Sequence, residues 1–333
     1  MSVVNGWIVG HVWVAWITAI IAFAVLARSA SLFVEGAVGL ARRLRIPTLV
    51  VGIVLVSLAT TAPELSVSLV SALRGKPEMA LGNAMGSVIC DDGLAMGLCG
   101  LMTVSVIVLD PIILKTSGVF LILVQALLFL FVVYDATLNR WEGAVLVALF
   151  VAYMAFLFRM HRQGRFRETA AAEAALHTGA NMGGRRMTAY FVVGLAGIVL
   201  ASEFIVTSAS AIAKSFGLSD AVIAMTLVAL GTSIPEVATC VTAARKGQGA
   251  MAVGNILGAD IMNICWVAGA SAIANPLTLS RQEIAFMFPA MFVIVAAMLI
   301  LLRIGYNLNR VKGAVLLALY AAYLAVFFLV FPR

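Results

Sequence analysis

The stretch Thr60-Thr61-Ala62-Pro63-Glu64 lies inside a strongly apolar segment, and its pattern returns as Thr232-Ser233-Ile234-Pro235-Glu236. A charged side chain at the centre of a bilayer costs about 2.5–3.5 kcal/mol on insertion scales. A proline inside a helix also deprives a carbonyl of the preceding turn of its donor. Two such costly elements at equivalent places indicate a binding site.

A glycine-rich element follows each copy at the same distance. It reads Gly82-Asn83-Ala84-Met85-Gly86-Ser87 in the first half and Gly254-Asn255-Ile256-Leu257-Gly258-Ala259 in the second. Both elements repeat at an offset of 172 residues (236 − 64 and 254 − 82). A later segment that starts at Asn139 resembles the one that starts at Asn309, at an offset of 170 (309 − 139). The chain therefore contains an internal repeat.

The composition is that of a membrane protein with several spans. Of 333 residues, 63% are hydrophobic and 11% charged, and the mean hydropathy is +1.09. A water-soluble globule has an apolar fraction nearer one half. About ten apolar runs are long enough to cross a hydrocarbon core of about 30 Å. They lie near residues 9–29, 47–73, 79–105, 112–134, 141–159, 187–208, 219–244, 250–275, 284–303 and 311–331.

The first run has no basic leader and no small-residue cleavage site, so we expect a retained helix rather than a signal peptide. The net charge of +7 comes from basic residues that are spread through the loops, so it does not indicate nucleic acid. In the ten-span arrangement, 16 of the 22 lysines and arginines fall on one side of the membrane. The positive-inside rule then places both termini outside the cytoplasm, most simply at the plasma (inner) membrane.

Each half holds about five spans. Because five is odd, the second copy enters the membrane with the opposite orientation, and a pseudo-two-fold axis in the membrane plane relates the halves. We therefore predict an all-α membrane protein of about ten transmembrane helices, built as two inverted-topology five-helix repeats. This architecture is typical of secondary transporters. The predicted units are residues 1–160 (motif 59–97), a cytoplasmic linker at 161–186, and residues 187–333 (motif 231–269).

Oxygen-bearing side chains recur one helical turn apart in these motifs. A pseudo-two-fold axis would gather them at the middle of the membrane, where carbonyls freed by the prolines add further oxygens. Such hard ligands favour Ca²⁺, Na⁺ or Mg²⁺ over zinc or copper. The candidates are Thr60 with Glu64, Ser87 with Asp91, Thr232 with Glu236, and Asp260 with Asn263. The glycines of the motifs predict close helix packing, and the four cysteines predict buried thiols.

The paired Thr-x-x-Pro-Glu and Gly-Asn-x-x-Gly-Ser/Ala elements resemble the two internal repeats of the sodium/calcium exchanger branch of the cation/Ca²⁺ exchanger superfamily. The resemblance covers nearly the whole chain. It implies ten helices around an ion-binding core, and an antiporter that exchanges Ca²⁺ for Na⁺ by alternating access. In this scheme spans 1 and 6 slide against the other eight.

The resemblance also implies roles for individual residues. Glu64 and Glu236 would be the central Ca²⁺ carboxylates, and Thr60 and Thr232 would give backbone oxygens. The hydroxyls that would help to bind Na⁺ are those of Thr61, Ser233 and Ser87. The proton/calcium branch tends to carry asparagine in place of the two threonines, so the sodium branch is the closer match.

Several positions depart from the family pattern, which has Gly-Ser-Asn-x-x-Asn in the first repeat and Gly-Ser-Asn-x-x-Asp in the second. Here Asp91 and Asn263 have in effect exchanged repeats, and Ala259 replaces a serine. Asp92 and Asp260 are additional acids. The missing hydroxyl weakens one Na⁺ site and extra carboxylates could carry protons, so proton-coupled cation antiport is the alternative.

Two more distant alternatives remain. Tyr134-Asp135 and Gly258-Ala259-Asp260 loosely echo the aspartate motifs of an intramembrane aspartyl protease, but that alternative leaves the duplicated glutamates unexplained. A passive channel is the other. We expect a transporter rather than an enzyme, with no cofactor. The lipid bilayer and the transported ions are its partners, and the oligomeric state is open.

Overall fold

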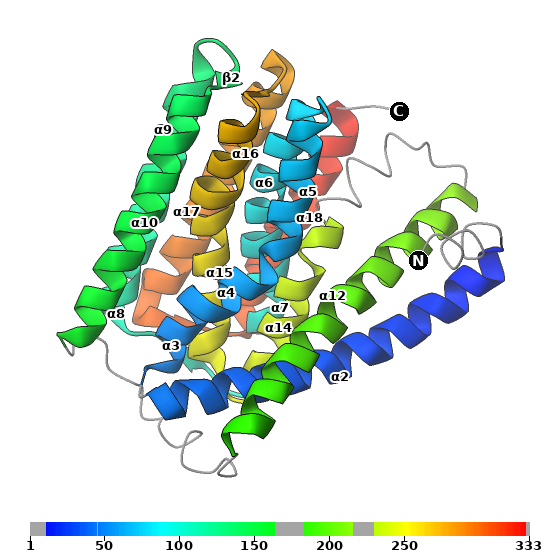
Figure 1. Cartoon of the computed structure of the whole chain (residues 1–333), viewed down its shortest axis with the longest axis vertical. Coiled ribbons are helices and arrows are strands. Elements are labelled where there is room, and N and C mark those ends of the chain that lie inside the picture. The colour runs from blue at the N-terminus through cyan, green and yellow to red at the C-terminus, as the bar shows by residue number, and fades with distance from the viewer. Residues whose placement is uncertain (1–10, 45, 164–182, 216–229, 331–333) are drawn as a thin grey trace.

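The computed structural model describes residues 11–44, 46–163, 183–215 and 230–330, and within them the chain is almost entirely helical (Figure 1). The first half holds α2 (Val12–Leu44), α3 (Thr48–Val51), η1 (Gly52–Val56), α4 (Ser57–Thr60), α5 (Ala62–Leu73), α6 (Pro77–Cys90), η2 (Asp91–Ala95), α7 (Met96–Met102), α8 (Pro111–Ile113), η3 (Leu114–Gly118), α9 (Val119–Val133) and α10 (Arg140–Arg162). The second half holds α12 (Gly184–Ser215), α14 (Ile234–Arg245), α15 (Gly249–Met262), η4 (Asn263–Ala268), α16 (Gly269–Ala274), α17 (Arg281–Arg303), η5 (Ile304–Tyr306) and α18 (Arg310–Val330).

The predicted all-α membrane fold is confirmed. Within the described ranges, eight helices are long and apolar enough to cross a membrane, or nine if the bent pair Thr48–Thr60 and Ala62–Leu73 counts as one span. Of the predicted span at 219–244, the first part lies outside the described residues, and α14 forms its end. Most of the predicted linker at 161–186 also lies outside them.

The first span was predicted too short. α2 continues to Leu44 rather than ending near residue 29, and its 33 residues give a length of about 50 Å. Because the hydrocarbon core is only about 30 Å thick, a helix of this length must tilt or extend beyond it. Figure 1 shows α2 and α12 side by side, slanting across the other helices. Arg28 lies in the middle of α2, so it does not belong with the cytoplasmic loop residues that set the predicted orientation.

Glycines allow α2 and α12 to approach each other closely. A Cβ atom at Gly36 would come within 2.5 Å of the backbone nitrogen of Phe191, and one at Gly194 within 2.5 Å of that of Phe33. The rings of Phe33 and Phe191 lie 4.8 Å apart between centroids. Such a reciprocal contact is the signature of a two-fold relation, here between the first helices of the two repeats.

Two short antiparallel ribbons connect the repeats. β1 (Ile107–Val108) pairs with β4 (Asn307–Leu308), and β2 (Thr137–Leu138) pairs with β3 (Leu277–Thr278). β1 and β3 lie at equivalent positions of the two repeats, as do β2 and β4, with an offset of 170 residues (277 − 107 and 307 − 137). The repeat relation therefore maps one ribbon onto the other. Paired strands must lie on one face of the membrane. The ten-span arrangement meets this condition for both ribbons, so the pairing supports the inverted topology.

The predicted glycine packing occurs on α15 but not at Gly82 of α6, where a Cβ atom would meet nothing within 4 Å. A Cβ atom at Gly254 would collide with the carbonyl of Leu49, and one at Gly258 with the carbonyl of Ile53 and, at 2.6 Å, with Ser57 Oγ. The second glycine-rich motif therefore lies directly against the backbone of α3, η1 and α4. The prediction of buried thiols also holds, because all four cysteines are free and buried.

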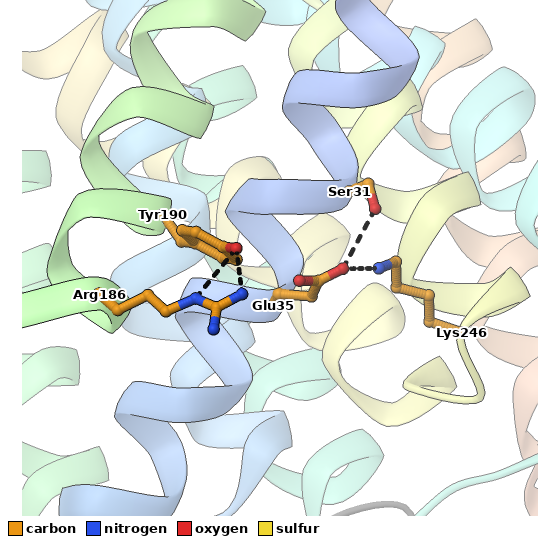
Figure 2. A network of polar contacts seen from close by, with 5 residues as sticks. All are labelled: Ser31, Glu35, Arg186, Tyr190 and Lys246. Carbon is orange, nitrogen blue, oxygen red and sulfur yellow. Dashed lines mark hydrogen bonds and ion pairs between the residues drawn. The ribbon is translucent and has the colours of Figure 1, made fainter. Parts of the chain in front are cut away.

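An ion pair ties the slanted helices to the rest of the molecule. Lys246, which follows the last residue of α14, places its Nζ atom 2.5 Å from Glu35 Oε1 on α2. Ser31 donates to the same oxygen at 3.4 Å (Figure 2). On α12, Arg186 donates to the Tyr190 hydroxyl and stacks over the ring. Because the side chains of Lys246 and Glu35 are about one third exposed, their pair is worth only about 0–1 kcal/mol, which permits α2 to separate from α14.

The contact between α2 and α14 gives a first prediction. In a background without the native thiols, Glu35→Cys with Lys246→Cys should form a disulfide on mild oxidation, seen as a loss of two free thiols by mass spectrometry. Tyr134→Cys with Lys246→Cys is the matched control, since the topology places these residues at opposite faces. Two thiols that remain free in the first pair would show that α2 does not dock in this way.

Candidate functional site

Both proline motifs interrupt a helix with the same backbone geometry. Thr61 caps α5 with φ −81° and ψ 1°, and Ser233 caps α14 with φ −82° and ψ 0°. A proline follows in the first turn of each helix, where its missing N–H is tolerated. Across the first break, the axis bends by 43°. Thr60 and Glu64 therefore do not form the continuous helical stripe that the sequence predicted, because the break falls between them.

The break places each glutamate at the start of a helix. Glu64 lies in the first turn of α5, and Glu236 in the first turn of α14. The first turn of a helix has N–H groups without intrahelical partners and the positive end of the helix dipole. Both features stabilise a negative charge, so the helix starts partly compensate the burial of these two carboxylates.

The residues after the glycine motifs adopt π-helical turns. η2 begins at Asp91 and η4 at Asn263, which are equivalent positions of the two repeats (263 − 91 = 172). The backbone N–H of Asp91 still bonds the carbonyl of Ser87, as expected for residues one turn apart. π-turns inside α-helices are frequent at functional sites.

Hydrogen bonds cross between the repeats in matching pairs. Thr60 Oγ1 donates to Asn255 Oδ1 at 3.3 Å, and its counterpart Thr232 donates to Asn83 Oδ1 at 3.2 Å. In addition, Thr61 Oγ1 donates to Glu236 Oε1 at 3.3 Å. The hydroxyls of Ser87 and Thr232 lie 3.5 Å apart. The structure thus brings together the predicted hydroxyl residues Thr60, Thr61, Thr232 and Ser87 from the two halves.

Five carboxyl groups are fully buried around this network. They belong to Glu64, Glu236, Asp91, Asp92 and Asp260, each with 0% exposure. Glu64 interacts electrostatically with Glu236 and Asp91, and Asp260 with Asp92 and Asp91. Apart from Glu236 Oε1, every oxygen of these groups lacks a hydrogen-bond partner within the part of the chain that the structure describes. Burying so much uncompensated charge is prohibitive, so the cluster is suited to hold cations or protons.

Two predicted site residues are less closely tied to the others. Ser233 is fully buried beside Asp91. Asn263 is also buried, but neither amide atom meets a partner among the described residues. In those same ranges no three His, Cys, Asp or Glu side chains converge on one point as a metal centre. Any metal ion would therefore need hydroxyl, amide or carbonyl oxygens besides the carboxylates.

Sequence reasoning missed the two asparagines of the glycine motifs as parts of the site. Asn83 and Asn255 are 4% and 0% exposed and accept the cross-repeat hydrogen bonds. The signal was the Gly-Asn dipeptide, which occurs at the same place in both repeats. Asp92, which the sequence identified as an additional acid but not as a ligand, also belongs to the buried cluster.

The geometry does not support a protease. Asp135 lies exposed in the turn before β2, where its carboxylate accepts from the backbone N–H of Thr137 at 3.1 Å. Asp260, by contrast, is fully buried in α15. The two aspartates of the proposed motif do not share a site.

The fold and the buried oxygen cluster define a membrane transporter of inorganic cations, built from two inverted repeats. The family described as sodium/calcium exchanger protein matches residues 14–159 and 186–329. The chain belongs to this family, whose members are transporters.

Individual relatives agree with this assignment. The sodium/calcium exchanger MaX1 of Methanosarcina acetivorans is 29% identical over 337 residues, which cover 91% of this chain and 95% of MaX1. The inner membrane protein YrbG of Escherichia coli is 32% identical over 259 residues, or 77% of this chain and 79% of YrbG. Among solved structures, the sodium-calcium exchanger NCX_Mj superposes with a TM-score of 0.79 at 25% identity, and covers 95% of this chain and 99% of its own.

The buried glutamates give a second prediction. Glu64→Gln or Glu236→Gln should abolish Ca²⁺ transport without lowering the melting temperature, because removing a buried charge relieves its desolvation cost as it destroys the site. Glu203→Gln, an exposed change on α12, is the control and should keep transport. Near-normal exchange by either purified glutamate variant would exclude the pair as ligands.

Proposed function

We propose that the chain is a secondary antiporter that exports Ca²⁺ in exchange for Na⁺ by alternating access. One observation carries this proposal. Glu64 and Glu236, related by the pseudo-two-fold axis, are fully buried at the starts of two interrupted helices and interact with each other. MaX1 and NCX_Mj are named sodium/calcium exchangers, which supports Ca²⁺ and Na⁺ as the transported ions.

The Ca²⁺ site would combine these carboxylates with backbone oxygens. Ca²⁺ takes 6–8 oxygens, more than two monodentate carboxylates supply. Proline has no N–H, so Pro63 and Pro235 leave the carbonyls of Ala59 and Gly231 without their usual helical donors. Together with the backbone oxygens of the neighbouring threonines, Thr60 and Thr232, these carbonyls would complete the coordination.

Na⁺ would use the hydroxyls and the remaining acids around the same axis. Thr61, Ser233 and Ser87 are buried hydroxyls close to the carboxyl cluster. Asp91, Asn263 and Asp260 would complete this set as side-chain oxygen ligands. The surplus acids Asp92 and Asp260 keep proton coupling as the alternative outcome of the transport test.

Alternating access would use the slanted helices. α2 and α12 pack closely on each other through their glycines, whereas an ion pair that is about one third exposed ties α2 to the end of α14. A tight pair with weak ties to its surroundings can slide as a unit. We infer that α2 and α12 move against the other helices and expose the site to each side in turn.

The coupling ion gives a third prediction. In proteoliposomes at clamped pH, an outwardly directed Na⁺ gradient should drive uptake of ⁴⁵Ca²⁺, because the threonines match the sodium branch. Glu236→Gln liposomes serve as the inactive control. Uptake that requires a pH gradient and ignores Na⁺ would replace sodium by proton coupling, and Ca²⁺ flux without any counter-ion would indicate a channel.

We further propose the plasma (inner) membrane as the location, with both termini outside the cytoplasm. YrbG is named an inner membrane protein, and the basic residues gather on the other side from the termini.

The orientation gives a fourth prediction. Gln163 is exposed and caps the end of α10, so Gln163→Cys in a thiol-free background should react with an impermeant reagent only after the cells are opened. Asn139→Cys, at the other end of α10, should react on intact cells. The reverse pattern would contradict the proposed orientation.

A further inference from the structure

We propose that Asn83 is a positioning residue: its amide oxygen accepts the hydrogen bond of the Thr232 hydroxyl, so that this hydroxyl oxygen can turn its lone pairs toward the bound cation, in addition to the backbone oxygen that Thr232 would supply. We also infer that its counterpart Asn255 does not do the same for Thr60. The inference rests on the proposed function. It goes beyond the predicted ligands because Asn83 acts through Thr232 and not as a ligand.

A chain of hydrogen bonds fixes the orientation of the Asn83 amide. Ser68 Oγ donates to the carbonyl of Ala80 at 3.1 Å, which uses its only proton. Ser68 can therefore only accept from its other neighbour, Asn83, whose Nδ2 atom lies 3.0 Å away. The same Nδ2 group faces the carbonyl of Glu64 at 3.5 Å. The amide nitrogen of Asn83 thus points to Ser68 and its oxygen to Thr232.

The direction of this chain continues through Thr232. In the hydrogen bond between Thr232 Oγ1 and Asn83 Oδ1, at 3.2 Å, the amide oxygen has no hydrogen, so Thr232 is the donor. The Ser87 hydroxyl, 3.5 Å from the same Thr232 oxygen, must then be a donor to it. All four side chains are buried, with exposures between 0% and 8%, so bulk water does not compete for these bonds.

This direction is the one a cation site requires. A hydroxyl oxygen can face a cation only if its hydrogen points elsewhere. The carboxyl group of Glu64 is a second acceptor within reach of the Thr232 hydroxyl, so it competes with Asn83 for the same hydrogen. Because Asn83 Oδ1 accepts this hydrogen bond, the carboxylate oxygens of Glu64 remain available to bind the cation.

The second repeat lacks this support. The Thr60 hydroxyl lies 3.3 Å from Asn255 Oδ1 but also 3.2 Å from the carbonyl of Val56, so its single proton is shared between these acceptors. Asn255 Nδ2 meets no partner among the described residues. Cys240 stands where the first repeat has Ser68 (240 − 68 = 172), and its thiol donates to the carbonyl of Ala252 at 3.7 Å. A thiol is a weak acceptor, so the Asn255 amide is not held in one orientation. Ala259 likewise replaces the hydroxyl of Ser87 (259 − 87 = 172).

The equivalent positions 68 and 240 allow a matched test of apparent Ca²⁺ affinity in proteoliposomes. Loss of one hydrogen bond is worth about 1 kcal/mol, so Ser68→Ala should raise the Ca²⁺ concentration for half-maximal exchange about fivefold while the maximal rate stays within about twofold. Ser68→Thr keeps the hydroxyl and should restore the affinity. Cys240→Ala should change it by less than about twofold.

A double-mutant cycle separates positioning from general damage to the fold. Asn83→Ala should weaken Ca²⁺ affinity strongly in the wild type and in Thr60→Val, but add little in Thr232→Val, because its action requires the Thr232 hydroxyl. For a variant that folds but transports too slowly to assay, the shift in melting temperature on adding Ca²⁺ replaces the transport affinity as the quantity compared in the cycle.

The outcomes distinguish the two proposals. Equal losses in Ser68→Ala and Cys240→Ala, or an Asn83→Ala effect that is the same in both threonine backgrounds, would overturn the positioning role while the exchanger function stands. If neither Ca²⁺ nor Na⁺ binds the wild-type protein, both proposals fall together.

Discussion

The burial of two glutamates in the membrane-spanning core is the constraint on which the rest of the structure depends. An isolated carboxylate in such a place is too costly to keep. Helix breaks at Thr61 and Ser233 put Glu64 and Glu236 at helix starts, and the Thr61 hydroxyl of the opposite repeat donates to Glu236. In the proposed function a bound ion would supply much of the compensation, because most of the carboxyl oxygens have no partner within the described residues.

A two-fold relation organises this site, and local departures from it make the halves chemically different. The cross-repeat hydrogen bonds, the two ribbons and the contact between α2 and α12 all exist in reciprocal pairs. By contrast, Ser68 and Ser87 of the first repeat are replaced by a cysteine and an alanine at the equivalent positions of the second. One half therefore holds its asparagine in a fixed orientation, and the other does not. An exchanger must bind two kinds of ion in one cavity, and such differences offer a physical basis for distinct subsites.

Much of the fold and site could be predicted because the repeated motifs keep a constant offset. The glutamates, threonines and serines of the motifs are buried, but the helix breaks at Thr61 and Ser233 interrupt the continuous helical stripe that the sequence predicted. The repeat in the first helix was not predicted, since its offset is 158 (194 − 36 and 191 − 33) instead of 172. Its Phe-x-x-Gly pattern, at Phe33 and Phe191, was therefore missed. The span was also drawn too short, because Arg28 suggested a membrane end and a tilted helix was not considered.

The support from Ser68 to Asn83 could not be predicted for a different reason. Its direction depends on which atom donates at each step, and this follows only from three-dimensional neighbours such as the carbonyl of Ala80. Sequence spacing identifies residues that share a helix face, but it does not say which side chains of two different helices meet.

A crystal structure of the protein soaked with Sr²⁺, an anomalous scatterer that replaces Ca²⁺, tests the central claim most directly. The account predicts one strong anomalous peak between the carboxyl groups of Glu64 and Glu236, which is lost in Glu64→Gln crystals. A peak centred elsewhere, or none at Sr²⁺ concentrations that inhibit Ca²⁺ exchange, would contradict it.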